Sequence, residues 1–196
     1  MIIGVVLCGG SSTRMGNDKG MMQHGSQTWA QIAFNKLRSL NIPVAVSINP
    51  VQHTAYHVVF SEELLVTDND ELNVGGPLKG ILSAHQQYPQ ADLMVLAVDI
   101  VKMSEELLWQ LYLYPGQPDT EAIVYKQEAH AEPLCGIYKA KALHKIVQLY
   151  EAGKLKKYSM HFILDQLQTV YIDVPSNQED KFNNFNSESD LANLQH

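Results

Sequence analysis

The sequence predicts an α/β protein with a mostly parallel β-sheet that helices cover on both faces, in three layers. Apolar runs typical of buried strands alternate with amphipathic stretches along the chain. A glycine-rich loop directly follows the first apolar run, as is common where a strand leads into a helix. The length of 196 residues suits one domain, residues 1–196.

The N-terminal half alternates strands and helices in order. The apolar run from Ile2 to Leu7 predicts a buried first strand. Thr28 and Gln31 have the spacing of a capping box, and the apolar residues after them recur at helical spacing. The predicted helices span Thr28 to Leu40 and Pro77 to Tyr88, and the further strands span Val44 to Ile48, Leu64 to Thr67 and Leu93 to Val98.

The C-terminal half continues the alternation. Ser104 is a helix N-cap candidate, because two acidic residues follow in the first turn, where they complement the helix dipole. Ser187 is expected to cap a short final helix. The predicted strands span Ala122 to Tyr125, Leu134 to Tyr138 and Val170 to Val174, and the predicted helices span Ala140 to Glu151 and Tyr158 to Leu167.

Composition excludes several classes of partner. The net charge is −7, whereas nucleic-acid binding depends on clustered Lys and Arg. No apolar run approaches the roughly 20 residues needed to span a bilayer. The N-terminal apolar run lacks a basic start and a small-residue cleavage site, so we expect no secretory signal and a cytoplasmic protein. Cys8 and Cys135 are too few for a disulfide framework and are expected to be buried.

The loop after the first strand is the most informative segment, and it reads Leu7-Cys8-Gly9-Gly10-Ser11-Ser12-Thr13-Arg14-Met15-Gly16-Asn17-Asp18-Lys19-Gly20. Glycines allow backbone amides to approach an anion closely, and Arg14 and Lys19 add positive charge. The loop matches neither G-x-x-x-x-G-K-[ST] nor G-x-G-x-x-G. We expect it to hold a polyphosphate.

These residues resemble the signature L-A-G-G-x-S-x-R-M-G-x-D-K of nucleotidyltransferases, most closely that of molybdenum cofactor guanylyltransferases, with Cys8 in place of Ala. The resemblance implies a single-domain, Rossmann-like fold of the nucleotide-diphospho-sugar transferase type. It implies transfer of GMP from GTP to molybdopterin, with release of pyrophosphate. Arg14 and Lys19 would bind the triphosphate and its developing charge, and Leu7, Cys8, Gly9 and Gly10 would contact the nucleotide. Related cytidylyl enzymes tend to read L-A-A-G, so Gly9 favours a purine.

Polar candidates follow the predicted strands, where open α/β sheets bind their ligands. Asp99 ends the most apolar strand, and a carboxylate there needs a compensating charge such as Mg²⁺. A helix cap or a loop ion pair is the alternative. The resemblance assigns Asp99 to the metal and to catalysis. The family usually continues C-D-x-P, but this chain reads Val98-Asp99-Ile100-Val101, which could shift the loop.

Two further candidates precede the second predicted helix. Asp68, with the turn at Gly76 in Gly75-Gly76-Pro77-Leu78-Lys79-Gly80, resembles the family segment D…GPLAG, which borders the nucleotide. Asp68 could equally form an Asx-turn in its acidic loop. Asn49 resembles a strand-end Asn that contacts the nucleotide, but Asn49-Pro50 is also a common start of a turn.

Later segments bear on the acceptor. Glu132-Pro133-Leu134 with Tyr138 resembles the family's acceptor-facing strand. Asn184 and Asn186 resemble its closing pair near the metal, although they could simply tie down a loop. His53 and His57 have the spacing of a helical zinc pair, but the H-E-x-x-H glutamate is absent and the segment around Tyr56 reads as extended, so a zinc site is discounted.

Two alternatives to the guanylyltransferase interpretation stay open. One is a nucleotidyltransferase for another acceptor: a sugar phosphate, a cobinamide phosphate or a cytidylyl acceptor. The other is a nucleotide-binding protein without turnover, which only the altered C-D-x-P segment favours. The sequence leaves the oligomeric state open.

Overall fold

The protein is built on a seven-stranded sheet between two helical layers, in a computed structural model that describes residues 1–9, 18–128, 130–185 and 187. The strands are β1 (Ile2–Leu7), β2 (Gln23–His24), β3 (Gln27–Thr28), β4 (Val44–Ile48), β5 (Leu65–Thr67), β6 (Asp92–Ala97), β7 (Ala122–Gln127), β8 (His130–Tyr138) and β9 (Thr169–Asp173). The α-helices are α1 (Trp29–Arg38), α2 (His53–His57), α3 (Pro77–Gln87), α4 (Glu105–Leu113), α5 (Ala140–Glu151) and α6 (Met160–Asp165). Short 3₁₀ helices are η2 (Lys19–Met21), η3 (Pro50–Gln52), η4 (Glu62–Leu64) and η5 (Ser176–Phe182).

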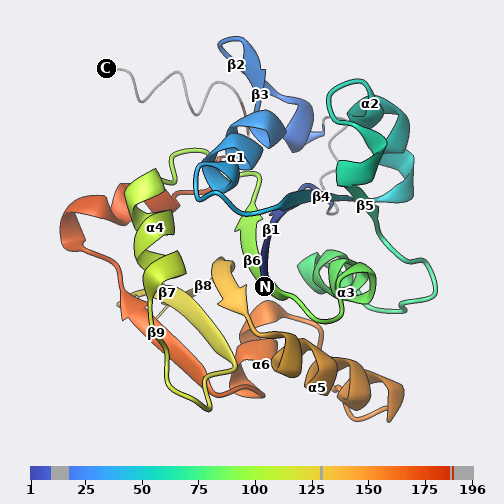
Figure 1. The fold of residues 1–196 in the computed structure, drawn as a ribbon, viewed down its shortest axis with the longest axis vertical. Helices are drawn as coiled ribbons and strands as arrows, with labels where there is room; N and C mark the ends of the chain where they lie inside the picture. Colours follow the sequence, from blue (N-terminus) through green and yellow to red (C-terminus); the bar gives the residue numbers. More distant parts are fainter. Residues whose placement is uncertain (10–17, 129, 186, 188–196) are drawn as a thin grey trace.

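The sheet has the strand order β5-β4-β1-β6-β8-β7-β9 (Figure 1). Strands β5, β4, β1 and β6 pair in parallel, as do β7 and β9. Strand β8 runs antiparallel to both of its neighbours. The predicted mostly parallel α/β sheet is therefore confirmed, with one reversed strand between its two parallel parts.

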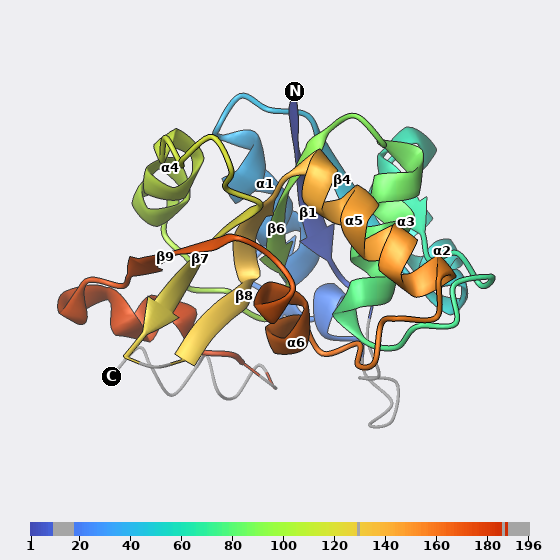
Figure 2. The same cartoon turned by 90° about the horizontal axis from the view of Figure 1, so that it is seen from below.

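Each face of the sheet carries its own hydrophobic core. Helices α1 and α4 pack on one face, and α3, α5 and α6 on the other (Figure 2). Consecutive residues of β1 alternate between the two cores: Val6 faces the first, whereas Val5 and Leu7 face the second. This alternation is the period of two that every strand imposes on its side chains, and it explains why β1 is apolar throughout.

Most of the predicted helix starts agree with the structure, whereas the helix predicted from Tyr158 begins at Met160. Thr28 caps α1 in a complete capping box with Gln31. Pro77 is the first residue of α3, after Gly76 at a φ of 69°. Ser104 caps α4 by accepting from the Leu107 backbone. The final helix expected after Ser187 lies outside the described residues.

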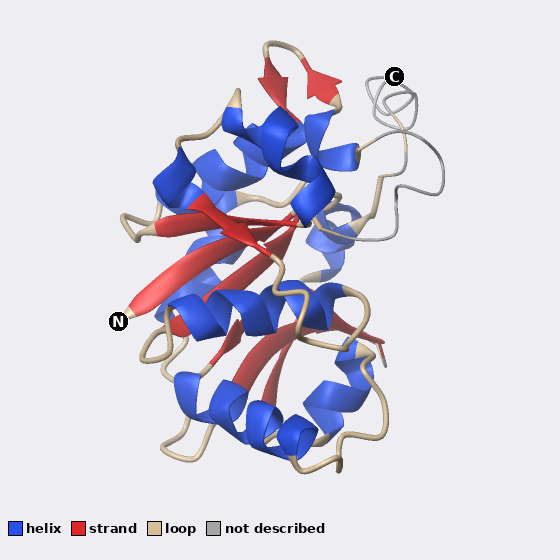
Figure 3. Cartoon of the chain, turned by 90° about the vertical axis from the view of Figure 1, so that its right-hand side faces the viewer, coloured by secondary structure: helices blue, strands red, loops and turns tan. Residues whose placement is uncertain are grey.

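Several short elements were not predicted. The β2–β3 hairpin projects beyond the helices (Figure 3). Helix α2 covers a segment that the sequence analysis described as extended around Tyr56, and that interpretation was wrong. The segment has no long periodic pattern, and its helix is held by the burial of one residue, Tyr56, in the core on the α1 side of the sheet. No helix among the described residues has the length and apolarity to cross a membrane.

The carboxyl ends of the parallel strands meet at one edge of the sheet. Leu7 is level with Ser47 of β4 and with Ala97 of β6, and Ile48 is level with Thr67 of β5. The residues that follow these strands therefore gather along one edge, as parallel topology requires.

Candidate active site

An ion pair joins the end of the glycine-rich loop to the end of β6. Lys19 Nζ lies 3.0 Å from Asp99 Oδ2, although the two residues are 80 positions apart. Both side chains are mostly buried, with 19% and 24% of their surface exposed. The sequence predicted both residues for the site, and the structure brings them together.

A network of hydrogen bonds holds Asp18, which caps the short helix η2 that begins at Lys19. Asp18 Oδ1 accepts from the backbone of Gly20 and from the Tyr56 hydroxyl, both at 3.0 Å. Asp18 Oδ2 accepts from Gln52 Nε2 at 2.7 Å. Burial raises the pKa of Tyr56, so its hydroxyl stays a donor to this carboxylate.

Position 20, beside this network, has room only for glycine. A Cβ on Gly20 would overlap the Tyr56 hydroxyl. Gln52 and Tyr56 could not be identified from the sequence, because their roles depend on contacts with Asp18, more than thirty positions away. Asp18 stood in the motif but had no assigned role, and only its neighbours show that it positions Lys19.

The loop after Asp99 is anchored from two directions. The Phe185 backbone donates to the Asp99 carbonyl at 3.0 Å, so the C-terminal segment docks against this loop. Lys36 of α1 donates to the carbonyl of Val101, the position where the family motif has proline. Burial lowers the pKa of Lys36 to about 8, and the nearby Lys181 cation acts in the same direction. The loop lacks the family proline but has this lysine contact instead.

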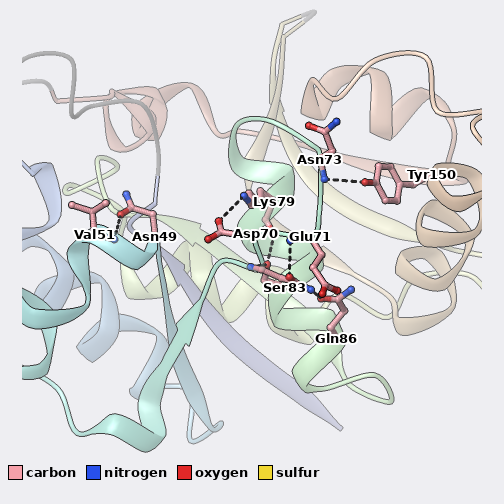
Figure 4. Close-up of polar contacts among 10 residues, drawn as sticks. Asn49, Val51, Asp70, Glu71, Asn73, Lys79, Ser83, Gln86 and Tyr150 are labelled. Carbon is pink, nitrogen blue, oxygen red and sulfur yellow. Dashed lines mark hydrogen bonds and ion pairs between the residues drawn. The ribbon is translucent and has the colours of Figure 1, made fainter.

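Asn49 has the structural role that the sequence left open, because it starts the turn after β4. Its Oδ1 accepts from the backbone of Val51 (Figure 4) and from that of Gln52, so it caps η3. Gln52 completes the capping box and also donates to the Cys8 carbonyl at 3.1 Å. Asn49 therefore shapes the rim of the site beside Cys8, and its contact to a nucleotide stays a prediction.

Asp68 lies between two glycine backbones at the end of β5. A Cβ on Gly9 would stand 3.3 Å from Asp68 Oδ2, and one on Gly80 would overlap the Ser47 hydroxyl and stand 3.4 Å from Asp68 Oδ1. Oδ1 is buried and has no hydrogen-bond partner among the described residues. Burial raises the pKa of Asp68 to about 6, and the Lys79 cation and the nearby Ser47 hydroxyl oppose that shift. A buried carboxylate oxygen without a partner is costly, and it suits a bound ligand that supplies donors.

The loop between Asp68 and Gly76 is fastened to two helices. The Asn69 backbone donates to Ser83 Oγ at 2.8 Å, and the Asn73 backbone donates to the Tyr150 hydroxyl at 2.9 Å (Figure 4). Gly76 has a positive φ with open space around its Cα, so backbone conformation, and not crowding, requires glycine there.

The Glu132 to Tyr138 motif builds a bulge beside the site. The pairing register shifts from Val124 with Gly136 to Tyr125 with Glu132, and the Tyr138 hydroxyl donates to the Pro133 carbonyl inside this bulge at 2.7 Å. Because β8 runs antiparallel to β6, the bulge lies at the carboxyl edge of β6. Glu132 is partly buried there, which raises its pKa.

The remaining predicted residues either lie outside the described part of the chain or contact other groups. Gly10, Arg14 and Asn186 lie outside the described residues. His53 and His57 lie on α2 and both contact Glu62, at 3.0 and 3.3 Å, on an exposed surface. The described part of the chain contains no group of three or more His, Cys, Asp or Glu side chains arranged to hold a metal ion.

Most of the described site residues lie within a stretch of the chain that matches a known protein family. The family model of the MobA-like NTP transferase domain matches residues 4–170. The chain belongs to this family. The match runs from β1 into β9, so it includes Lys19, Asp68 and Asp99.

Individual relatives of this MobA-like chain agree with that assignment. The molybdenum cofactor guanylyltransferase of Campylobacter jejuni subsp. doylei is 28% identical over 182 residues, which cover 93% of this chain and 89% of that protein. A probable molybdenum cofactor guanylyltransferase of Halalkalibacterium halodurans is 26% identical over 194 residues, which cover 97% and 96%.

Solved structures share the fold. Molybdopterin-guanine dinucleotide biosynthesis protein A from Archaeoglobus fulgidus superposes with a TM-score of 0.76 at 20% identity, covering 98% of this chain and 96% of that chain. The 4-diphosphocytidyl-2C-methyl-D-erythritol synthase from Anaerococcus prevotii superposes with a TM-score of 0.71 at 10% identity, covering 100% and 96%. These likenesses establish a nucleotidyltransferase fold.

Proposed function

We propose that this protein transfers GMP from GTP to molybdopterin, which forms the guanine dinucleotide cofactor and releases pyrophosphate. The observation that carries the proposal is the Lys19–Asp99 pair, which places a cation and a carboxylate at the carboxyl edge of the sheet. Family membership and relatives named for this reaction support it. The free, buried state of Cys8 and Cys135 is consistent with a reducing cytoplasm.

In this proposal, positioning and charge supply most of the rate. The terminal phosphate of the acceptor attacks the α-phosphorus of GTP, and pyrophosphate leaves on the opposite side. Lys19, together with Arg14 from the loop, neutralises the triphosphate oxygens as negative charge shifts to the leaving group. Gln52 and Tyr56 hold Asp18, which caps the helical turn that begins at Lys19, so the backbone of Lys19 requires little reorganisation during the reaction.

The residues at the edge of β6 fit a magnesium ion. Lys19 engages Asp99 Oδ2, and a carboxylate has a second oxygen that a cation can use. Mg²⁺ commonly takes one or two protein carboxylates and completes its shell with phosphates and water, so a site with a single carboxylate suits it. When bound, it would neutralise phosphate oxygens of the substrate. Asp99 is the residue that would hold it.

The nucleoside would lie along the ends of β1, β4 and β5. Gly9 leaves space for a purine, and the Leu7, Cys8 and Gly9 backbone borders that space together with Asn49 and Gly76. Asp68 offers a carboxylate to donors of the base or ribose.

The decisive experiment is a transfer assay with purified protein. GTP, Mg²⁺ and molybdopterin should together give pyrophosphate and the dinucleotide, whereas omission of any one should stop product formation. CTP and ATP should be poorer donors. Product with CTP, or with a sugar phosphate or cobinamide phosphate as acceptor, would instead assign another nucleotidyl transfer. GTP binding without turnover on any of these acceptors would point to a binding protein.

A further inference from the structure

Lys79 occupies an electrostatically unfavourable position at the start of α3. It is the third residue of the helix, where the dipole disfavours a cation. Its ammonium lies 3.2 Å from Asp70 Oδ1, and Figure 4 shows this pair above the first turn of α3. Asp70 is 79% exposed, so the pair contributes little to stability. The resembling family segment, GPLAG, has alanine here. Helix stability therefore does not explain this lysine.

Lys79 shares the rim of the site with Asp68. Its charge opposes the raised pKa of Asp68, so the two groups interact electrostatically. Gly80, the next residue of α3, lies against Asp68. Ser83, one helical turn after Lys79, receives the backbone hydrogen bond of Asn69. The first turn of α3 thus faces the end of β5, and it holds the Lys79 ammonium at Asp70, two residues after the Asp68 carboxylate.

Nucleobases differ in the order of donors and acceptors along one edge. Guanine presents the acceptor O6 beside the donors N1–H and N2–H₂, whereas adenine presents the donor N6–H₂ beside the acceptor N1. An ammonium next to a carboxylate complements guanine at both points. With adenine, the ammonium would face a donor and the carboxylate would face an acceptor.

We propose that Lys79 is a guanine-specificity residue, which donates to O6 while Asp68 accepts from N1–H and the 2-amino group. This inference rests on the proposed function, because it requires GTP in the site. A charge-assisted hydrogen bond to one base atom corresponds to roughly a tenfold to hundredfold difference in affinity.

The test measures nucleotide binding by calorimetry with Mg²⁺ present, for the wild type, Lys79→Ala and Lys79→Arg. Lys79→Ala should weaken the binding of GTP and of ITP by the same factor, roughly tenfold or more, since both nucleotides carry O6 and N1–H. Its affinity for ATP should stay the same or rise. Lys79→Arg should retain part of the preference for GTP. Alanine favours helix, so the variant should fold, as circular dichroism can verify.

Asp70→Asn is the matched control. It removes the ion pair but keeps the ammonium, so the preference for GTP over ATP should persist. If Asp70→Asn reproduces Lys79→Ala, the lysine acts through the Asp70 loop, and the inference is wrong. Equal losses for GTP and ATP in Lys79→Ala would also overturn it, because the ammonium would then contact phosphate or ribose.

The outcomes separate this inference from the proposed function. A wild type that prefers GTP, together with a Lys79→Ala variant that keeps the full preference, overturns the role of Lys79 alone. A wild type that binds GTP no better than ATP overturns the guanine assignment itself, and the inference with it.

Discussion

Lys19 and Asp99 show how single residues of the site depend on one another. Each charge would be costly in its partly buried position without the other. Both residues could be predicted from the sequence, because Lys19 belongs to the loop motif and Asp99 directly follows an apolar strand. The sequence could not predict Gln52 and Tyr56, since no local pattern shows that their side chains reach back to Asp18.

Removing either member of the ion pair should abolish transfer while the fold persists. Lys19→Ala removes charge that the leaving pyrophosphate needs, and Asp99→Ala removes the carboxylate proposed for the metal. We expect the rate of pyrophosphate release to fall by at least about 100-fold in each variant. Circular dichroism should match the wild type. Near-normal turnover in either variant would remove that residue from the mechanism.

Gly20 and Tyr56 should show coupled effects on stability. Gly20→Ala places a methyl group against the Tyr56 hydroxyl and should cost about 1–3 kcal/mol. Tyr56→Phe leaves Asp18 short of a donor and should cost a similar amount, about 1–3 kcal/mol. In the double variant the hydroxyl is gone, so the total loss should be smaller than the sum by about 1 kcal/mol.

Urea unfolding of the two single variants and the double variant measures this coupling. Tyr158→Phe is the matched control, because Tyr158 is 37% exposed and its hydroxyl should contribute less than about 0.5 kcal/mol. Strictly additive losses would show that Gly20 and Tyr56 do not constrain each other.

At the scale of elements, the sequence predicts those helices and strands that are long enough to show a periodic pattern of apolar residues. Helix α1 begins at its capping box and β6 is apolar from Leu93 to Ala97, so both were predictable from local pattern. The β2–β3 hairpin has strands of two residues, which are too short to show alternation. Helix α2 has five residues, too few for periodicity to be detected. These short elements obtain their conformation from tertiary contacts.

The contact between α3 and α5 contains a pH-sensitive group. His85 is buried, its Nδ1 has no hydrogen-bond partner among the residues that the structure describes, and its ring packs edge to face on His144 with the ring centroids 4.6 Å apart. Burial, and secondly His144, lowers the pKa of His85 from 6.5 to about 4. Between those pH values the unfolded chain binds a proton that the folded protein does not bind. Stability from this group is therefore complete above pH 6.5 and is lost as the pH falls toward 4.

His85→Leu should make the free energy of unfolding less dependent on pH between 6.5 and 4. On going from pH 7.5 to 5.0, His85 should account for a loss of about 2 kcal/mol in the wild type. The variant should lack that loss, whatever its stability at neutral pH. Urea midpoints at the two pH values measure the difference. Identical pH dependence in both proteins would exclude His85 as the sensitive group.

At the scale of the whole molecule, topology assembles the site. Because β1, β4, β5 and β6 are parallel, the residues after them meet at one edge, and this much follows from the sequence once the strands are known. The reversed strand β8 and its bulge bring the Glu132 motif to the same edge. This placement could not be predicted from the sequence, because it depends on the register in which β8 pairs with its neighbours. The chain carries a net charge of −7, so under the proposed function the cations of this edge have to offset the repulsion between the protein and an anionic nucleotide.

Ligand binding at this edge should stabilise the entire fold, because the site joins segments from both ends of the chain. Free GTP with Mg²⁺ at about 100 times its dissociation constant should add about 2.7 kcal/mol, which raises the melting temperature by roughly 5–10 °C. GTP with EDTA, or Mg²⁺ alone, should give a much smaller shift. In Asp99→Asn the shift with GTP should be the same with Mg²⁺ or EDTA, since the carboxylate proposed for the metal is gone. An undiminished shift of the wild type in EDTA would mean that nucleotide binding does not require a divalent cation.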